Sequence, residues 1–317
     1  MVQVRRLGRV RLALTGVLAL GVVGCSASSH TSAPLGDGSI KSIKVVATGG
    51  ADRGPVDAAP APDGSVFYFT ANGTGGPAVI GVPGNGGATS TLTAGAPLVH
   101  PVGLAVATNG KSVFVADPGA SRIFSVPAAG GAATVVAGTE GRSPRGLDVT
   151  VAGGHDVISF TGTDPADGTA GLFSIPAAGG SVTVVAKGAP LVSPDAVVVA
   201  GNVAYVTDRG NSGGAGAVLK VSNGRAVKFA DARLGDPGGI SLTRDNKTLL
   251  ISSQNATTGS DQVLLIDVAT GKSGVASKVI GANHDSSGGL HRAYSSAVFA
   301  WADVRRSGPV YRVDPNP

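Results

Sequence analysis

The residues of this chain best able to do chemistry are charged side chains in the loops between hydrophobic segments. Guanidinium groups pair with anions, and histidines exchange protons near neutral pH. Gathered in one cavity, such groups would recognise a small anionic ligand or a polar protein surface; dispersed, they would only keep the loops solvated. The candidate ligand-binding residues are Arg53, His100, Arg142, Arg145, Asp195, Asp236, His284 and Asp285.

Histidines offer a second kind of site. His100, His284 and His291 would supply three imidazoles if they converged, and three imidazoles can hold a zinc ion. The plainer interpretation puts His100 and His284 in exposed loops. His291 is then expected to pack or form a hydrogen bond within a strand.

The first 25 residues have the pattern of an export signal. Four arginines between residues 5 and 11 precede an apolar stretch that is too short to span a bilayer comfortably. That stretch ends in VVGC at Cys25, the only cysteine of the chain, and this ending resembles a bacterial lipobox. The resemblance implies cleavage before Cys25 and a diacylglyceryl group on its sulfur.

Three segments follow from this pattern: a signal peptide over residues 1–24, a lipid-anchored flexible tether over 25–38 and a folded domain over 39–317. The expected location is the bacterial cell envelope, facing away from the cytoplasm, on the cell membrane or the outer membrane. The membrane would be a partner through the lipid on Cys25. Without a second cysteine, the folded domain must be stable without internal disulfides.

The apparent basicity of the chain belongs to this signal. The whole sequence has 25 Lys and Arg against 20 Asp and Glu. Without the four arginines of residues 5–11 the numbers are 21 and 20, a net charge of +1. Nucleic-acid binding depends on an excess of basic groups, so the composition argues against a nucleic-acid partner.

Past residue 38 the sequence repeats. FSVPAAGGAATVVAG at 124–138 returns as FSIPAAGGSVTVVAKG at 173–188. These phrases belong to six longer units, spaced 43 to 50 residues apart, in which runs of Val, Ile and Phe alternate with Gly and Asn-Gly turns. Four antiparallel strands in each unit predict an all-β fold, a six-bladed β-propeller. The units open at Pro55, Pro101, Pro144, Pro194, Pro237 and Ser287.

The two ends of the domain complement each other. The sixth unit stops before a fourth strand, whereas residues 39–48 resemble a fourth strand that has no unit of its own. A propeller that is not closed leaves two exposed sheet edges. We therefore expect Val45 and Val46 to pair with the region Val310 to Val313, so that an N-terminal strand completes the last blade.

The strand order divides the loops between two faces. We call the face with the short turns between first and second strands the turn face. The link face carries the loops between second and third strands and the connections between blades. Link-face loops differ from unit to unit, and variable loops on a rigid scaffold often bind ligands, so the sequence predicts the site there, near the axis. Asp117, Asp208 and Asp303 end second strands, where a turn-capping role is expected.

The segments PVGLAVATNGKSVFVADPGASRIFSV at 101–126 and AYVTDRGNSGGAGAVLKV at 204–221 resemble NHL-repeat propellers. They also resemble the gluconolactonase-like and strictosidine-synthase-like six-bladed families, over residues 39–317 in all. The lactonase-like resemblance implies an axial calcium ion held by a glutamate before the first Gly-Pro, together with Asn and Asp. Here Arg53 has the place of that glutamate, and the metal candidates are Asp195, which fits, and Glu140, a displaced substitute.

The function expected from the sequence is that of a lipid-anchored binding module of the cell envelope, whose partner is a small polar ligand or an envelope protein. The alternative is a metal-dependent hydrolase or lyase of the lactonase-like type, acting on a lactone or an ester. Because most of that family's metal-ligand pattern is missing, the sequence favours binding over catalysis. No cofactor is predicted, and calcium belongs to the alternative only.

Overall fold

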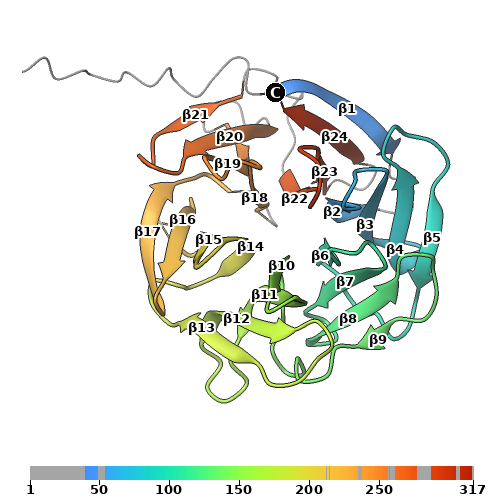
Figure 1. Cartoon of the computed structure of the whole chain (residues 1–317), viewed down its shortest axis with the longest axis horizontal. Coiled ribbons are helices and arrows are strands. Elements are labelled where there is room, and N and C mark those ends of the chain that lie inside the picture. Colours follow the sequence, from blue (N-terminus) through green and yellow to red (C-terminus); the bar gives the residue numbers. More distant parts are fainter. Residues whose placement is uncertain are drawn as a thin grey trace, which may run out of the picture. The chain divides into compact units, whose positions relative to one another are not determined.

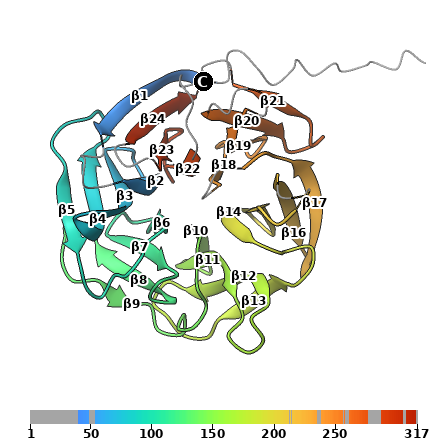
Figure 2. The same ribbon diagram turned by 180° about the vertical axis from the view of Figure 1, so that it is seen from behind.

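Each repeat of the sequence folds into a four-stranded antiparallel sheet, and six such sheets surround a central axis (Figures 1 and 2). In every sheet the first strand lies nearest the axis and the fourth lies at the rim. The predicted six-bladed β-propeller is thus confirmed. The computed structural model describes residues 40–48, 54–211, 213, 215–234, 238–255, 257, 261–276, 287–304 and 308–315.

The blades are numbered from the first complete repeat. Blades 1 to 3 consist of β2 (Pro55–Pro60), β3 (Val66–Gly73), β4 (Gly76–Pro83), β5 (Ser90–Ala94); β6 (Gly103–Val106), β7 (Ser112–Asp117), β8 (Arg122–Pro127), β9 (Thr134–Val135); and β10 (Leu147–Ala152), β11 (His155–Thr163), β12 (Ala170–Pro176), β13 (Thr183–Lys187). Blades 4 to 6 consist of β14 (Pro194–Ala200), β15 (Val203–Asp208), β16 (Ala217–Ser222), β17 (Arg225–Asp231); β18 (Ile240–Leu242), β19 (Thr248–Gln254), β20 (Asp261–Asp267), β21 (Ser273–Val275); and β22 (Ser287–Arg292), β23 (Phe299–Asp303), β24 (Pro309–Pro315), β1 (Ile40–Thr48).

The repeated Pro-Ala-Ala-Gly-Gly phrase forms the turn between third and fourth strands. Gly130 and Gly131 in blade 2 have φ angles of 89° and 146°, and Gly179 and Gly180 in blade 3 have 88° and 128°. Residues with a side chain rarely adopt such angles, whereas glycine does so readily. The phrase recurs because each of these turns needs two glycines in succession.

The N-terminal strand closes the ring as expected. β1 pairs antiparallel with β24, with Ile43 opposite Val313, Val45 opposite Tyr311 and Ala47 opposite Val310. The predicted signal peptide, the tether and Cys25 lie outside the described residues. Among the residues that are described, no helix is long and apolar enough to span a membrane.

The hydrophobic core is divided into clusters, each shared by two neighbouring blades. Phe67 and Phe69 of β3 pack toward blade 6, whereas Tyr68 between them packs toward blade 2. Successive side chains of a strand point to opposite faces of its sheet, so one strand contributes to two clusters. The same arrangement joins blades 2 and 3, 3 and 4, 4 and 5, and 5 and 6.

Hydroxyl groups on second strands also join the blades near the axis. Thr70 Oγ1 accepts a hydrogen bond from the Asp57 N–H (3.2 Å) and donates one to the Val102 carbonyl of blade 2 (3.0 Å). Thr161 and Thr207 make the equivalent pairs of bonds from blade 3 to blade 4 and from blade 4 to blade 5. These bonds satisfy backbone groups on inner strands, which lie at a sheet edge.

Asp117 and Asp208, at the ends of second strands, cap loops as the sequence predicted. Asp117 accepts backbone hydrogen bonds from Ala120 in the loop that follows and from Val99 and His100 in the connection between blades 1 and 2. Asp208 holds the corresponding loops of blade 4 in the same way. Their carboxylates therefore have a structural role.

Candidate functional site

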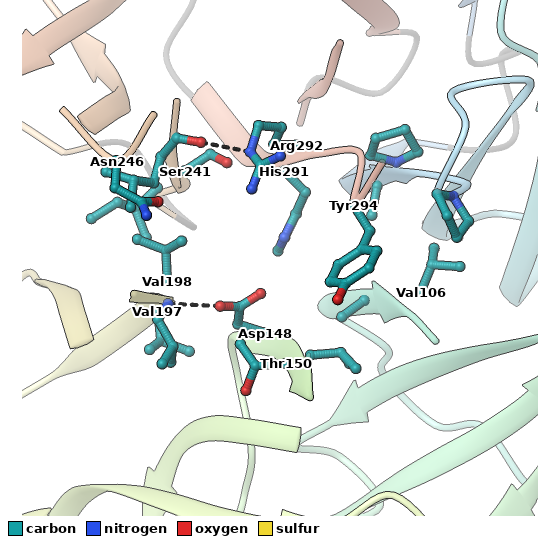
Figure 3. Close-up of a pocket in the computed structure, with 18 residues that line it drawn as sticks. Val106, Asp148, Thr150, Val197, Val198, Ser241, Asn246, His291, Arg292 and Tyr294 are labelled. Carbon is teal, nitrogen blue, oxygen red and sulfur yellow. Dashed lines mark hydrogen bonds between the residues drawn. The ribbon is translucent and has the colours of Figure 1, made fainter. Parts of the chain in front are cut away.

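The innermost strands of all six blades line a pocket on the central axis (Figure 3). Its volume is about 160 Å³. The pocket lies toward the turn face, where Pro62, Asn246 and Tyr294 line it from the turns that follow β2, β18 and β22. Alanine, valine, isoleucine and leucine side chains make up much of the wall. The few charged and polar groups in it therefore stand out.

Asp148 presents its carboxylate to the pocket from β10 (Figure 3). Its Oδ2 atom accepts a hydrogen bond of 2.7 Å from the backbone N–H of Val199 in the neighbouring blade. Burial raises the pKa of Asp148 to about 6, although the Val199 N–H and the charges of His291 and Arg292 act in the opposite direction. The carboxyl group thus titrates just below neutral pH.

His291 points into the same pocket from β22 and forms a buried pair with Asp57 of β2. His291 Nε2 and Asp57 Oδ2 are 3.0 Å apart, so the expectation that His291 forms a hydrogen bond is confirmed. Asp57 also accepts backbone hydrogen bonds of 2.8 Å from Ala58 and from Leu104 in blade 2. Burial lowers the pKa of His291, but the charge of Asp57, the hydrogen bond with Asp57 and the charge of Asp148 together outweigh this effect, and the pKa is raised. The imidazolium form is therefore favoured.

Arg292 is fixed by backbone carbonyl groups. Its Nε donates to the Leu242 carbonyl of blade 5 (2.8 Å), and its Nη1 donates to the Ala293 carbonyl (3.0 Å). Burial lowers the pKa of Arg292, and the nearby charge of Asp148 opposes this effect. Arginine keeps its proton at neutral pH, so the pocket contains a held guanidinium group.

Neutral hydrogen-bonding groups complete the lining. Thr150, Ser241 and Asn246 contribute hydroxyl and amide groups, and Tyr294, which is 51% exposed, turns its hydroxyl toward the pocket (Figure 3). A ligand would meet an acid, cations and neutral donors and acceptors within an apolar wall. This combination is typical of sites that bind small molecules specifically.

The link-face end of the axis is nearly filled. The pocket that the described residues form there has a volume of about 10 Å³. A Cβ atom on Gly103 would lie 1.9 Å from the Arg145 carbonyl oxygen, and one on Gly146 would lie 2.3 Å from that of Asp195. The inner strands approach one another so closely here that only glycine fits.

The structure brings together two of the residues singled out from the sequence at this end, Arg145 and Asp195. Asp195 Oδ1 lies 2.7 Å from Arg145 Nε, and its Oδ2 lies 3.2 Å from Arg209 Nε. Oδ2 also accepts a hydrogen bond of 2.7 Å from the Gly238 N–H. Asp195 is thus an ion-paired residue that connects blade 4 to blade 5.

This surrounding does not fit the axial calcium site that the lactonase-like resemblance implies. The two guanidinium groups that pair with the Asp195 carboxylate repel a cation there. Ca²⁺ also requires several oxygen ligands. Glu140 is exposed and accepts a backbone hydrogen bond within its own loop. Within the described ranges, no group of three or more His, Cys, Asp or Glu side chains is arranged to hold a metal ion.

The remaining sequence-predicted residues are dispersed or lie outside the described part of the chain. The guanidinium carbon of Arg142 is 5.0 Å from the centre of the Phe173 ring, and its Nε and Nη1 are buried without a hydrogen-bond partner among the described residues. His100 is exposed on a link-face connection. The candidates outside the described residues are Arg53, Asp236, His284 and Asp285.

Sequence reasoning did not assign the groups that line the larger pocket. Asp148 and Arg292, which line this pocket, and Asp57, which pairs with His291, were not singled out, and His291 was expected to pack or form a hydrogen bond within a strand. The signal that could have found them is a charged residue inside an apolar innermost strand, as in the segment LDVTVA of β10. Such a residue needs a partner, because burial of an unpaired charge is costly.

Comparisons with known proteins support the fold. No model of a protein family matches the chain. No curated protein sequence matches it either. Solved structures do match: a gluconolactonase from Xanthomonas campestris has a TM-score of 0.61 at 16% identity, over 86% of this chain and 89% of that chain.

Two further solved structures are similar. A calcium-binding protein, regucalcin, from Agrobacterium tumefaciens has a TM-score of 0.59 at 11% identity, over 84% of this chain and 94% of that chain. A chain of a nidogen/laminin complex has a TM-score of 0.59 at 18% identity, over 76% of this chain and 86% of that chain. At these identities the likeness establishes the propeller fold alone.

Proposed function

We propose that the protein is a lipid-anchored, extracytoplasmic β-propeller that binds a small polar ligand in its axial pocket. The observation that carries the proposal is the pocket itself, about 160 Å³ in volume and walled by inner strands of all six blades. Strands of a closed ring hold the lining residues in place, so a ligand would not have to order them on binding. Asp148, His291 and Arg292 supply the polar contacts.

Ligand binding has more support than the hydrolase alternative. The similar structures include a gluconolactonase and a calcium-binding protein, but they share only 16% and 11% of residues with this chain. At the position that the lactonase-like resemblance assigns to a calcium ligand, Asp195 is paired with Arg145 and Arg209. We therefore assign the chain a binding role.

The pocket can be tested with a blocking substitution and a matched control. Thr150 lines the pocket, whereas the next residue, Val151, is 48% exposed. Successive residues of β10 point to opposite faces, so Thr150→Trp places an indole in the pocket and Val151→Trp places one outside it. The assay is ligand-observed NMR with a library of small polar compounds.

Compounds that bind the wild-type protein should fail to bind Thr150→Trp and should bind Val151→Trp unchanged. Circular dichroism of both variants verifies that they are folded. The proposal fails if no compound binds the wild-type protein, or if the bound compounds are equally retained by Thr150→Trp.

The anchor rests on the lipobox-like sequence that ends at Cys25. A thioether-linked lipid with two or more acyl chains holds a protein firmly to a membrane. Expressed in a bacterial host, the wild-type chain should incorporate labelled fatty acid and sediment with membranes, and Cys25→Ala should do neither. Equal labelling of Cys25→Ala would contradict the anchor and leave the pocket proposal untouched.

A further inference from the structure

The acid and the guanidinium group of the axial pocket come from opposite sides of the ring. Asp148 lies on β10 in blade 3 and Arg292 on β22 in blade 6, and the shared clusters order the blades from 1 to 6 and back to 1. Blades 3 and 6 are therefore opposite each other, as Figure 1 shows. In Figure 3 the two side chains occupy opposite walls of the pocket.

Each of the two groups is held by the protein through some of its atoms and leaves another for a ligand. Asp148 is fixed through Oδ2 by the Val199 N–H, and its Oδ1 faces the pocket in Figure 3. Arg292 is fixed through Nε and Nη1 by the carbonyl groups of Leu242 and Ala293. Its Nη2 makes no hydrogen bond with the residues that the structure describes. Both groups are thus oriented before a ligand arrives.

His291 does not disturb this balance of charge. Its imidazole is paired with Asp57 at 3.0 Å, so the protonated ring and the carboxylate together contribute little net charge. What remains is one negative group, Asp148, facing one positive group, Arg292. Between them the wall consists of short aliphatic side chains such as Ala105, Val197 and Ile240.

The size of the pocket limits the ligand. A cavity of about 150 Å³ holds a molecule the size of benzene, and this pocket measures about 160 Å³. A ligand with one charge would satisfy either Asp148 or Arg292 and leave the other facing an apolar ligand atom, at the cost of desolvation. A small molecule with both charges would satisfy the two at once.

We propose that the axial pocket selects small zwitterions, with the ligand's ammonium group at Asp148 and its carboxylate at Arg292. This inference rests on the proposed function and specifies the chemical class of its ligand. The aliphatic wall would contact the carbon chain between the two charges. Selectivity then comes from the paired charges on opposite blades.

The experiment is isothermal titration calorimetry on the folded wild-type protein with amino acids of increasing length. The probes are glycine, β-alanine, γ-aminobutyrate and δ-aminovalerate, because the length that spans the pocket should bind best. Butyrate and butylamine are the matched compounds with one charge each. At least one zwitterion should bind about tenfold tighter than both, since each lost ion pair leaves a group unpaired.

Two substitutions locate the charges. Asp148→Asn keeps an oxygen for the Val199 N–H. It should weaken the binding of the best zwitterion about tenfold and leave the affinity for butyrate unchanged. Arg292→Gln should weaken the binding of the zwitterion and leave the affinity for butylamine unchanged. The control is Asp167→Asn, which alters an exposed aspartate in the β11–β12 loop. If Arg292→Gln does not fold, the comparison of zwitterion with butyrate on Asp148→Asn decides by itself.

The results separate the two proposals. If butyrate or butylamine binds as tightly as every zwitterion, and Thr150→Trp blocks that binding, the zwitterion class is wrong and the ligand pocket stands. If Asp148→Asn weakens butyrate and the zwitterion equally, the charge assignment is overturned. If no compound loses binding in Thr150→Trp, the proposed function itself fails.

Discussion

At the scale of single residues, the carboxylate of Asp57 is a buried charged group that joins three blades near the axis. Its carboxylate accepts two backbone hydrogen bonds and the bond from His291, so it connects blade 1 to blade 2 and to blade 6. Both members of the pair are buried. A buried pair need not stabilise a fold more than apolar residues would, but removal of one partner leaves the other charge uncompensated.

We therefore expect Asp57→Asn to lower the free energy of unfolding by about 3 kcal/mol at neutral pH. The amide retains one acceptor oxygen but cannot offset the charge on His291. Urea denaturation followed by circular dichroism measures the change. Asp63→Asn is the control, because Asp63 lies in an exposed turn whose hydrogen bond from Ser65 an asparagine can also accept. Equal losses in both variants would contradict the prediction.

The same pair makes stability depend on pH. The pKa of His291 is raised in the folded state, so its contribution is complete below the unfolded pKa and is lost as the pH rises through the folded pKa. The charged groups facing it are Asp57 on β2 and Asp148 on β10, with Arg292 on its own strand. The raised pKa of Asp148 likewise makes the folded state less stable as the pH rises, and this effect is complete once the pH has passed its folded pKa of about 6.

Wild-type protein should thus be more stable at about pH 6 than at about pH 9, and Asp57→Asn should lose most of this difference. An NMR titration of the His291 ring should show a lower pKa in Asp57→Asn, because the carboxylate that raises it is gone. An unchanged titration would mean that Asp57 does not set the charge of His291.

At the scale of elements, the repeats made the fold predictable. The Pro-Ala-Ala-Gly-Gly turns mark where third strands end. The two glycines are needed there because the turn requires positive φ angles that other residues avoid. The unpaired fourth-strand pattern at 39–48 indicated how the ring closes, and β1 pairs with β24 there. These features depend on local sequence and on the need to cover sheet edges.

The pocket depends on information that the local pattern lacks. The variable loops predicted a site on the link face. The inner strands lie so close together there, at glycines such as Gly103 and Gly146, that little space is left for a ligand. Which inner-strand side chains face the axis also depends on register. β2 and β14 shift register against their partners near Asp57 and Asp195, and such irregularities redirect side chains. Simple alternation therefore fails on these two strands, whereas β10, which carries Asp148, keeps one register from Leu147 to Ala152.

At the scale of the whole molecule, each blade is stabilised by two neighbours. The shared clusters run round the ring without a free end once β1 has joined blade 6. Repeat proteins with nearest-neighbour interfaces can unfold in parts. In a closed ring, loss of one blade exposes two interfaces at once, so we expect all blades to unfold together.

Trp301, the only tryptophan, is buried in blade 6 and reports on that blade. Ile158→Val in blade 3 should lower the free energy of unfolding by about 1 kcal/mol, and Val46→Ala on the closing strand by about 2 kcal/mol. In each variant, the urea midpoint measured by tryptophan fluorescence and the midpoint measured by circular dichroism should shift by the same amount. Val45→Ala, at a position 53% exposed, should move neither, whereas a fluorescence midpoint insensitive to Ile158→Val would show that the blades unfold separately.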